Sequence, residues 1–377
     1  MKLPDFKTEQ WMNDYEKQAV HNLTDTTVQA VSFQELTALE PQAFSDLILD
    51  YGDIPGSQAL RQEILSLYEN RNPATLSIAN GCLEANFVVM ETLLEPGDRV
   101  ITPVPGYQQF SDVPKALGCA VDTVRLTPDE WHLDLRALEN AVEEDTRMII
   151  LNNPSNPTGA LLGRKELMQI AEIARRHDLW VLCDEAFLLP DADHPSFSDL
   201  YEKGISTSSL SKTLGLAGIR LGWIKGHPDL IHDIAVRNDY TMISAGPLRD
   251  TAAWIGLRHR KFFLDRARAI IGQNRKDIES WLAVTQRFSV RLPDAGTTCF
   301  MKIHGDVDDV RLCQDLLRDT GIFFVPGSCF DTPGYVRLGL GQKQNGLPEV
   351  LKTLDTYVEN YLKSNQVSSA AGWRDFF

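Results

Sequence analysis

The feature that most restricts the fold is a series of short, mainly apolar segments separated by helical stretches in the central part of the chain. Five segments are predicted to be strands: R-V-I-T (99–102), M-I-I-L (148–151), L-W-V-L-C (179–183), I-S-T-S-S (205–209) and L-G-W-I (221–224). Between two of them, Leu167, Ile170, Ala171 and Ala174 have the spacing of one helix face. Apolar strands that alternate with helices predict an α/β fold, with a mostly parallel sheet covered by helices on both faces.

The pattern changes near residue 275, where strand-like and helical segments no longer alternate. Segments such as T-C-F-M-K-I (298–303) and Y-V-R-L-G-L (335–340) surround a helical stretch near 309–319. We therefore expect a large domain over residues 45–275, and a smaller α+β domain formed by residues 1–44 together with 276–377. The tail K-S-N-Q-V-S-S-A-A-G-W-R-D-F-F (363–377) matches no structural pattern and is not assigned.

Composition excludes several classes of function. The 377 residues carry a formal net charge of −15, which opposes a nucleic-acid-binding surface and a regulator that binds DNA. The six cysteines are scattered without a C-x-x-C pair, as in a protein with reduced thiols. No apolar signal-peptide core opens the sequence, and no stretch is long and apolar enough to span a membrane. We expect a cytoplasmic protein, and the sequence gives no reason to expect a metal site.

Polar side chains follow three successive predicted strands. Asn156 lies in N-N-P-S-N-P-T-G (152–159), Asp184 ends L-W-V-L-C-D, and Lys212 follows I-S-T-S-S. Ligands of open α/β sheets bind beyond the carboxyl ends of the strands, so these side chains are expected to meet. Neither Lys212 nor Arg220 has an acid nearby in S-S-L-S-K-T-L-G-L-A-G-I-R-L-G-W (208–223), which suggests that a bound anion pairs with them.

This set of side chains suits an aromatic aldehyde cofactor that carries a phosphate. A partly desolvated lysine such as Lys212 can act as an amine nucleophile toward an aldehyde. An acid such as Asp184 can keep a pyridinium nitrogen protonated. Serine hydroxyls, the guanidinium of Arg220 and backbone N–H groups at a helix start can hold a phosphate.

Three motifs resemble the fold-type I, pyridoxal-phosphate-dependent aminotransferases of class I/II. They are N-P-x-N-P-T-G (153–159), D-E-A-F (184–187) and S-x-S-K-x-x-x-x-x-G-x-R-x-G (209–222), in the order and spacing of that family. The resemblance implies that Lys212 forms the internal aldimine with pyridoxal 5′-phosphate and later moves the α-proton of the substrate. It also implies that Asp184 pairs with the pyridine nitrogen and that Asn156 bonds the 3-oxygen. The implied phosphate ligands are Ser209, Ser211 and Arg220.

Two segments are similar to cofactor-binding stretches of the same family. N-G-C-L-E-A-N (80–86) resembles a phosphate-binding loop with its turn at Gly81, and Leu83 replaces the usual hydroxyl residue. The backbone N–H groups of Cys82 and Leu83 are therefore the implied donors. P-V-P-G-Y-Q-Q-F (103–110) resembles the segment whose aromatic residue stacks on the cofactor, which makes Tyr107 the candidate.

Two further similarities concern the partner subunit and the substrate. Y-G-D-I-P-G-S-Q-A-L-R (51–61) resembles a segment whose tyrosine, here Tyr51, reaches the phosphate of the neighbouring subunit, which implies a homodimer. V-R-L-G-L (336–340) resembles the strand whose arginine, here Arg337, binds the substrate α-carboxylate. The implied substrates are an L-amino acid and a 2-oxo acid, but the sequence does not identify the substrate side chain.

One departure from the family pattern leaves the reaction open. Phe187 stands where the family has a tyrosine that donates to the 3-oxygen of the cofactor, and its loss should raise the aldimine pKa. The segments at 23–36 and 237–248 also resemble a side branch that includes capreomycidine synthase, a pyridoxal-phosphate cyclase. The prediction is therefore a transaminase, with a pyridoxal-phosphate-dependent lyase or cyclase that eliminates a β or γ group as the alternative.

Overall fold

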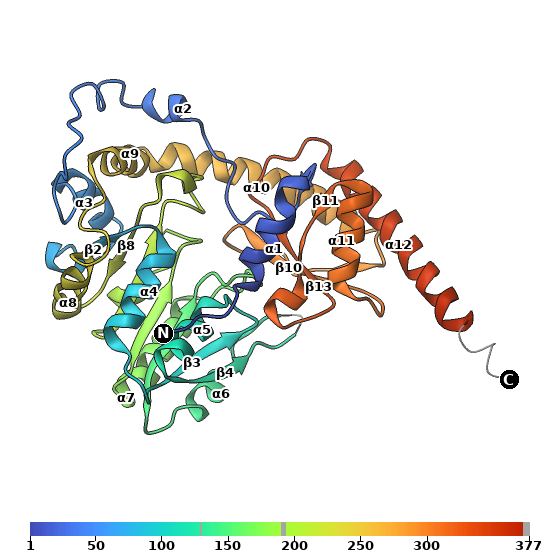
Figure 1. Cartoon of the computed structure of the whole chain (residues 1–377), viewed down its shortest axis with the longest axis horizontal. Helices are drawn as coiled ribbons and strands as arrows, with labels where there is room; N and C mark the ends of the chain where they lie inside the picture. The colour runs from blue at the N-terminus through green and yellow to red at the C-terminus, as the bar shows by residue number, and fades with distance from the viewer. Residues whose placement is uncertain (129, 190–193, 372–377) are drawn as a thin grey trace.

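The computed structural model describes residues 1–128, 130–189 and 194–371, so the end of the unassigned tail, residues 372–377, lies outside the described residues. In Figure 1 the large sheet and the helices around it occupy the left half of the molecule, and the smaller sheet lies in the right half. Helix α1 (Lys7–Tyr15) lies between them, and the long helix α10 (Arg260–Leu282) runs from the first region to the second. Within the described residues, no helix has the length and hydropathy needed to span a membrane.

The large sheet contains seven strands, and most of them are parallel. Strands β3 to β7 pair in parallel, whereas β8 is antiparallel to both of its neighbours. Across the sheet the order is β2 (Leu76–Ala79), β8 (Gly222–Lys225), β7 (Gly204–Ser209), β6 (Trp180–Asp184), β5 (Thr146–Asn152), β3 (Arg99–Val104) and β4 (Ala120–Arg125). The α/β architecture and the five strands expected from the sequence are confirmed; β2 and β4 were not predicted.

Helices cover both faces of this sheet because its central strands bury alternate side chains on opposite sides. Ile150 and Leu182 pack against α4 (Cys82–Leu93), α5 (Gln109–Leu117) and α8 (Pro228–Asn238). Leu151 and Cys183, the next residues along the same strands, pack on the other face, toward α7 (Arg164–Arg176). Such strands have no polar face, which is why their sequences are apolar throughout. The short helix α6 (Leu135–Asn140) lies beside α7.

A second apolar cluster packs at the β2–β8 edge of the large sheet. It contains Leu60, Ile64 and Trp223, and it is built largely from α3 (Gln58–Leu65) and α9 (Pro247–Arg258), with α2 (Phe33–Thr37) against α9. Leu60, Ile64, Leu67 and Tyr68 have the spacing of one helix face in the sequence, but α3 ends at Leu65. The helix ends earlier because the chain turns at Ser66, and Tyr68 reaches the core from the turn, where its hydroxyl accepts from Trp223 Nε1 at 2.6 Å.

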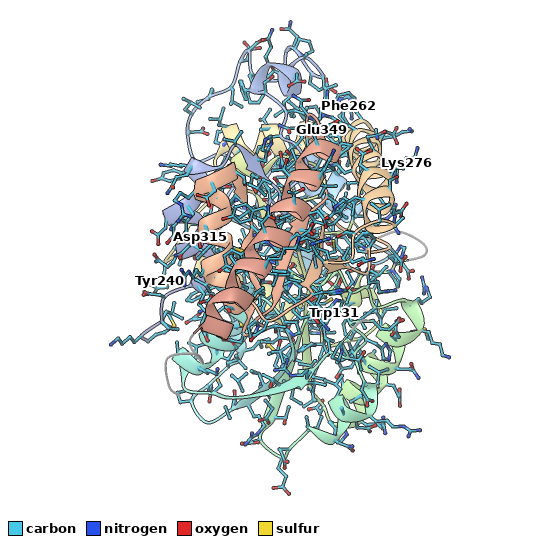
Figure 2. All side chains as sticks on the ribbon, turned by 90° about the vertical axis from the view of Figure 1, so that its right-hand side faces the viewer. Trp131, Tyr240, Phe262, Lys276, Asp315 and Glu349 are labelled. Atoms are coloured by element: carbon cyan, nitrogen blue, oxygen red, sulfur yellow. The ribbon has the colours of Figure 1, made fainter. Side chains whose placement is uncertain are left out.

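The second region is built on a four-stranded antiparallel sheet. Its order is β12 (Val325–Pro326), β13 (Tyr335–Gly339), β10 (Thr298–Ile303) and β9 (Phe288–Ser289), and a separate parallel pair joins β1 (His21–Asn22) to β11 (Ile322–Phe323). Helices α10, α11 (Asp309–Thr320) and α12 (Leu347–Ala371) cover it, and Figure 2 shows them at the front, marked by Lys276, Asp315 and Glu349. The mixed α and β content expected for the C-terminal part is present.

The segment from Leu23 to Gln29 connects the two regions through its backbone. Its N–H and C=O groups pair with Phe323 and Gly339 in the small region, and Val28 N–H donates to the carbonyl oxygen of Lys212 at 3.0 Å. A Cβ on Gly339 would lie 1.9 Å from the carbonyl oxygen of Asp25, so only glycine permits this approach. The segment is therefore fixed between the two sheets.

Candidate active site

The carboxyl ends of three adjacent parallel strands open into a cavity of about 380 Å³ between the two sheets. Asn156 follows β5, Asp184 ends β6, and Lys212 follows β7, as the sequence predicted. The residues that line this cavity are Glu9, Met12, Asp25, Thr26, Cys82, Leu83, Asn86, Tyr107, Asn152, Asn156, Asp184, Ala186, Phe187, Ser209, Ser211, Lys212, Ala217, Arg220 and Arg337. The fold thus brings together ten of the twelve predicted site residues; Gly81 is adjacent, and Tyr51 lies elsewhere.

Asp184 is a buried carboxylate held by neutral donors. Asn86 Nδ2 donates to Asp184 Oδ2 at 2.6 Å, and the Ala186 N–H donates to Oδ1 at 3.0 Å. Thr207 Oγ1 in turn donates to Asn86 Oδ1 at 2.6 Å, which fixes the orientation of the amide. Burial raises the pKa of Asp184, and these hydrogen bonds oppose that shift. A carboxyl group in this setting suits a cationic ring nitrogen in the cavity.

Lys212 has a hydroxyl rather than a carboxylate as its partner. Its Nζ donates to Thr26 Oγ1 at 2.7 Å and lies 5.6 Å from the centre of the Phe187 ring. Burial lowers the pKa of Lys212, and the positive charge of Arg337 lowers it further. A lowered pKa makes the neutral amine, which is the nucleophile toward an aldehyde, easier to form.

A second group of residues forms a cradle at the start of α4. Gly81 precedes the helix with a φ of 83°, and a Cβ there would lie 2.8 Å from Arg220 Nη2. Arg220 Nη2 also lies 3.4 Å from the carbonyl oxygen of Asn80, so the guanidinium is held against this turn. Ser209, the last residue of β7, and Ser211, in the loop after it, line the cavity, and the Ser211 N–H donates to Ser209 Oγ at 3.4 Å. Helix N–H groups, hydroxyls and a guanidinium together suit a phosphate.

Arg337 is a buried guanidinium on β13, opposite Phe300 of β10. Its Nε donates to the carbonyl oxygen of Thr24 at 3.2 Å, and its Nη1 lies 3.4 Å from Asn156 Oδ1. Within the described parts of the chain, no carboxylate forms an ion pair with Arg337. Burial lowers the pKa of Arg337, so a carboxylate from a ligand would stabilise its charged form.

The two predicted tyrosines occupy different places. Tyr107 lines the cavity, and its hydroxyl donates to Glu9 Oε1 at 3.2 Å. Burial is the main cause of the raised pKa of Tyr107, so its hydroxyl stays protonated. Tyr51 is 66% exposed in a separate surface depression beside Trp254, and it does not reach the cavity of its own chain.

Sequence reasoning missed several residues that contact the predicted ones, among them Asn86, Thr24 and Thr26. Asn86 lies four positions after Cys82 on α4, so helical spacing from the phosphate-loop motif could have indicated it. Thr24 and Thr26 carry no such signal because their segment has neither strand nor helix periodicity. Their contacts with Arg337 and Lys212 arise only when the chain folds across the small region.

The donor set fits pyridoxal 5′-phosphate. An amine sits in the same cavity as a buried acid, an amide and a cradle that a Cβ at Gly81 would fill. The amine of Lys212 suits an aldehyde carbon, the acid of Asp184 suits a pyridine nitrogen, and the amide of Asn156 suits a phenolic oxygen. The cradle at Gly81 suits a phosphate. Arg337 is left over after this assignment, and it suits the carboxylate of a second ligand.

Comparison with known proteins identifies the class of enzyme. The model of the family "Aminotransferase class I and II" matches residues 13–354. The chain is 36% identical to a PLP-dependent aminotransferase from Streptococcus suis, with a TM-score of 0.91 over 96% of this chain and 99% of that one. It is 27% identical to capreomycidine synthase from Streptomyces vinaceus over 94% of this chain and 95% of the other. It is also 25% identical to an aspartate aminotransferase from a Bacillus species, over 85% and 88%.

The fold and the similarities define a fold-type I enzyme that depends on pyridoxal 5′-phosphate. The chain belongs to the class I and II aminotransferases, and the resemblance inferred from its motifs is confirmed. The predicted cofactor and the predicted transaminase activity are confirmed with it.

The hydrogen bond from Asn86 to Asp184 gives a testable effect on stability. We expect Asn86→Ala to lower the free energy of unfolding of the cofactor-free protein by about 1–3 kcal/mol, because a buried carboxylate loses a donor. The folded-state pKa of Asp184 is already raised, so the folded state binds this proton more readily than the unfolded chain. Stability from this group therefore falls as pH rises above the unfolded pKa of about 3.9. The loss of stability in Asn86→Ala should thus be larger at pH 8 than at pH 5 in urea denaturation.

Asn238→Ala is the matched control, because its amide donates to Ser77 Oγ at 3.2 Å and forms no hydrogen bond to a carboxylate among the described residues. Its effect on the free energy of unfolding should be the same at both pH values. An equal loss at pH 5 and pH 8 in Asn86→Ala would contradict the interpretation of Asp184.

Proposed function

We propose that Lys212 binds the aldehyde carbon of pyridoxal 5′-phosphate covalently and that the surrounding cavity transfers an amino group between an L-amino acid and a 2-oxo acid. The observation that supports this assignment is an amine with a lowered pKa, paired only with the Thr26 hydroxyl among the described residues, at the end of β7. Asp184 and Arg337 line the same cavity. The bound cofactor withdraws electrons from the substrate Cα, which makes the α-proton acidic.

Each remaining residue then has one role. Asp184 keeps the ring nitrogen protonated, Asn156 donates to the 3-oxygen, and Tyr107 covers a face of the ring. Arg337 binds the α-carboxylate of the substrate in two hydrogen bonds and so orients its Cα toward Lys212, whose amine moves the α-proton. The groups proposed to bind the phosphate are the backbone N–H groups of Cys82 and Leu83 after the Gly81 turn, with Ser209, Ser211 and Arg220.

We also propose that the enzyme is a homodimer in which Tyr51 reaches the phosphate of the neighbouring subunit. Ile48, Leu49 and Tyr51 are large and exposed, and Tyr240, at the edge of the molecule in Figure 2, is 88% exposed. The two segments adjoin, because Ser244 Oγ donates to the carbonyl oxygen of Tyr51 at 2.7 Å. Exposed apolar side chains gathered in this way are typical of an interface between subunits.

Two further proposals concern the whole chain. We propose that residues 45–275 form the large cofactor-binding domain and that residues 1–44 with 276–377 form the small domain. This division follows the two sheets, although α2 packs against α9 of the large region and α10 crosses the boundary. A cytoplasmic location is proposed because all six cysteines are free, and five of them are buried.

A lyase or cyclase reaction on an amino acid is the alternative. The similarity to capreomycidine synthase supports it, and so does Phe187, which leaves the 3-oxygen of the cofactor without the usual phenol. Both reactions need the α-proton removed, and they differ in the group that leaves next.

The covalent role of Lys212 can be tested on the reconstituted enzyme. We expect Lys212→Ala to lose the visible absorbance of lysine-bound cofactor and to retain no cofactor after borohydride reduction and denaturation. Lys225→Met is the matched control, because Lys225 is also buried and burial also lowers its pKa. That variant should keep both signals; covalent cofactor in Lys212→Ala, seen by peptide mass spectrometry, would refute the assignment.

The reaction type can be tested with purified holoenzyme and single amino acids. A transaminase should form pyridoxamine phosphate and an equal amount of the matching 2-oxo acid, because the amino group stays on the cofactor until an acceptor arrives. Absorbance spectra and mass spectrometry of the products measure both species. Release of pyruvate or ammonia without an acceptor would instead support the lyase or cyclase reaction.

The dimer can be tested by placing a charge in the exposed apolar surface. We expect Leu49→Arg to halve the mass measured by light scattering and to weaken cofactor binding, because Tyr51 would no longer reach its neighbour. Val284→Arg is the control, since Val284 is an equally exposed aliphatic residue after α10. A monomeric wild-type enzyme with full cofactor affinity would contradict the proposal.

A further inference from the structure

Two carboxylates in the cavity have no role in the proposed chemistry. Glu9 comes from α1 and Asp25 from the segment that crosses between the sheets, and both line the cavity with Lys212 and Arg337. The proposed function assigns Lys212, Arg220 and Asp184 to the cofactor and Arg337 to the α-carboxylate. Every cation that lines the cavity is then used, and the negative charges of Glu9 and Asp25 remain for the substrate side chain.

Asp25 is a fixed charge without a counter-ion in the described residues. Its Oδ1 accepts from the N–H and the hydroxyl of Thr27 at 2.7 and 2.8 Å. Its Oδ2 accepts from Gln342 Nε2 at 3.0 Å. These donors are neutral, so they orient the carboxylate and leave its charge uncompensated. Each oxygen of a carboxylate can accept more than one hydrogen bond, so Asp25 can still receive a donor from a ligand.

Glu9 is held at one oxygen only. Its Oε1 accepts from the Tyr107 hydroxyl at 3.2 Å, and no group in residues 1–128, 130–189 or 194–371 donates to Oε2. The helix that carries it is anchored nearby, because Trp11 Nε1 donates to the carbonyl oxygen of Phe324 at 2.9 Å. Glu9 therefore presents a free carboxylate oxygen from a positioned helix, beside the ring proposed to cover the cofactor.

Glu9 and Asp25 both influence the pKa values of Lys212 and Arg337. Burial is the main cause of the lowered pKa of Lys212 and of Arg337, and Glu9 and Asp25 both oppose that lowering. Burial also raises the pKa of Glu16, which Asp25 and Glu9 raise further. Once the ligand anions of the proposed function occupy Lys212, Arg220 and Arg337, the charges of Glu9 and Asp25 attract a cation and repel an anion.

A substrate with a distal carboxylate has no receptor in this arrangement. Such a group would need a second arginine or lysine, and the described residues lining the cavity offer none beyond those already assigned.

The other end of the substrate is fixed independently of these acids. Arg337 is buried to all but 5% of its surface, lines the cavity, and has no carboxylate partner among the described residues. We propose that Glu9 and Asp25 bind a cationic group on the substrate side chain, so that this enzyme acts on α-amino acids with an amine or guanidinium side chain. The inference rests on the proposed function, because it uses Arg337 as the α-carboxylate site.

Spectral titration of the holoenzyme with three amino acids of matched length tests the proposal. L-Lysine, L-norleucine and L-2-aminoadipate carry a cation, a methyl group and a carboxylate at similar distances from Cα, and L-arginine supplies a guanidinium. We expect L-lysine or L-arginine to bind roughly tenfold more tightly than L-norleucine, as one charge-assisted contact allows, and L-2-aminoadipate to bind most weakly. Calorimetry provides the same dissociation constants without relying on turnover.

Glu9→Gln then separates charge from structure, because its amide oxygen can still accept from Tyr107. This variant should lose most of the preference for the cationic amino acid and bind L-norleucine as the wild type does. Asp14→Asn is the matched control, since it removes one charge from an exposed position of the same helix, outside the cavity, and should change neither constant.

Two results would overturn the proposal. If L-norleucine binds as tightly as both cationic amino acids, or if Glu9→Gln weakens the neutral and cationic ligands equally, the carboxylates do not recognise the side chain while the proposed function stands. If none of the four amino acids alters the cofactor spectrum, the inference fails, whereas the proposed function fails only if Lys212→Ala still binds the cofactor covalently.

Discussion

The site depends on hydrogen bonds that two buried cations, Lys212 and Arg337, donate to residues 23–29, a segment that is neither helix nor strand. Thr24 accepts from Arg337, and Thr26 accepts from Lys212, so residues 23–29 hold together side chains that come from different sheets. The stretch fits there because glycines permit it: a Cβ on Gly341 would lie 2.3 Å from the carbonyl oxygen of Thr27, and one on Gly215 would lie 2.8 Å from that of Gln29. Without this bridge, the amine and the guanidinium would belong to two separate surfaces.

These partners are neutral, and this has an electrostatic consequence. A buried cation paired with a carboxylate is already stabilised and has little to gain from a ligand, whereas one paired with hydroxyls and carbonyl oxygens still lacks a counter-charge. Lys212 and Arg337 also repel each other, which adds to the lowering of the Lys212 pKa by burial. A carboxylate bound at Arg337 would screen that repulsion and raise the basicity of the Lys212 amine. In the proposed mechanism, substrate binding and proton abstraction are thereby coupled through a single pair of charges.

The sequence predicted the parts of the site that follow from the parallel sheet. Asn156, Asp184 and Lys212 follow β5, β6 and β7, and the carboxyl ends of parallel strands must meet at one edge, so their proximity could be inferred without coordinates. The central strands were identifiable because they are buried on both faces. β4 was not, because it is an edge strand whose residues are largely exposed. β2, at the other edge of the sheet, was also missed although its four residues are buried.

The contacts that could not be predicted join residues far apart in the chain and lie outside any periodic element. The Thr26 hydroxyl and the Lys212 amine are 186 positions apart, and the Glu9 carboxylate and the Tyr107 hydroxyl are 98 apart. A polar residue in a loop or at a helix start is common, and its neighbours depend on how the small region docks. Motifs therefore locate the groups proposed to bind the cofactor better than those proposed to bind the substrate, because one sheet edge positions the former.

The site therefore has two parts with different proposed roles. The large sheet supplies the amine, the acid and the phosphate cradle, and their geometry is fixed by strands that pair directly. The N-terminal residues and β13 supply Glu9, Asp25, Thr26 and Arg337, which contact the substrate or adjust Lys212 in the proposed arrangement. The two parts meet at Lys212. Phe187, on the side of the large sheet, lacks the tyrosine hydroxyl expected at this position, and the hydroxyl that contacts Lys212 comes instead from Thr26 in the N-terminal segment. In the proposed arrangement, changes at Glu9 or Asp25 alter which amino acid binds without replacing any residue proposed to hold the cofactor.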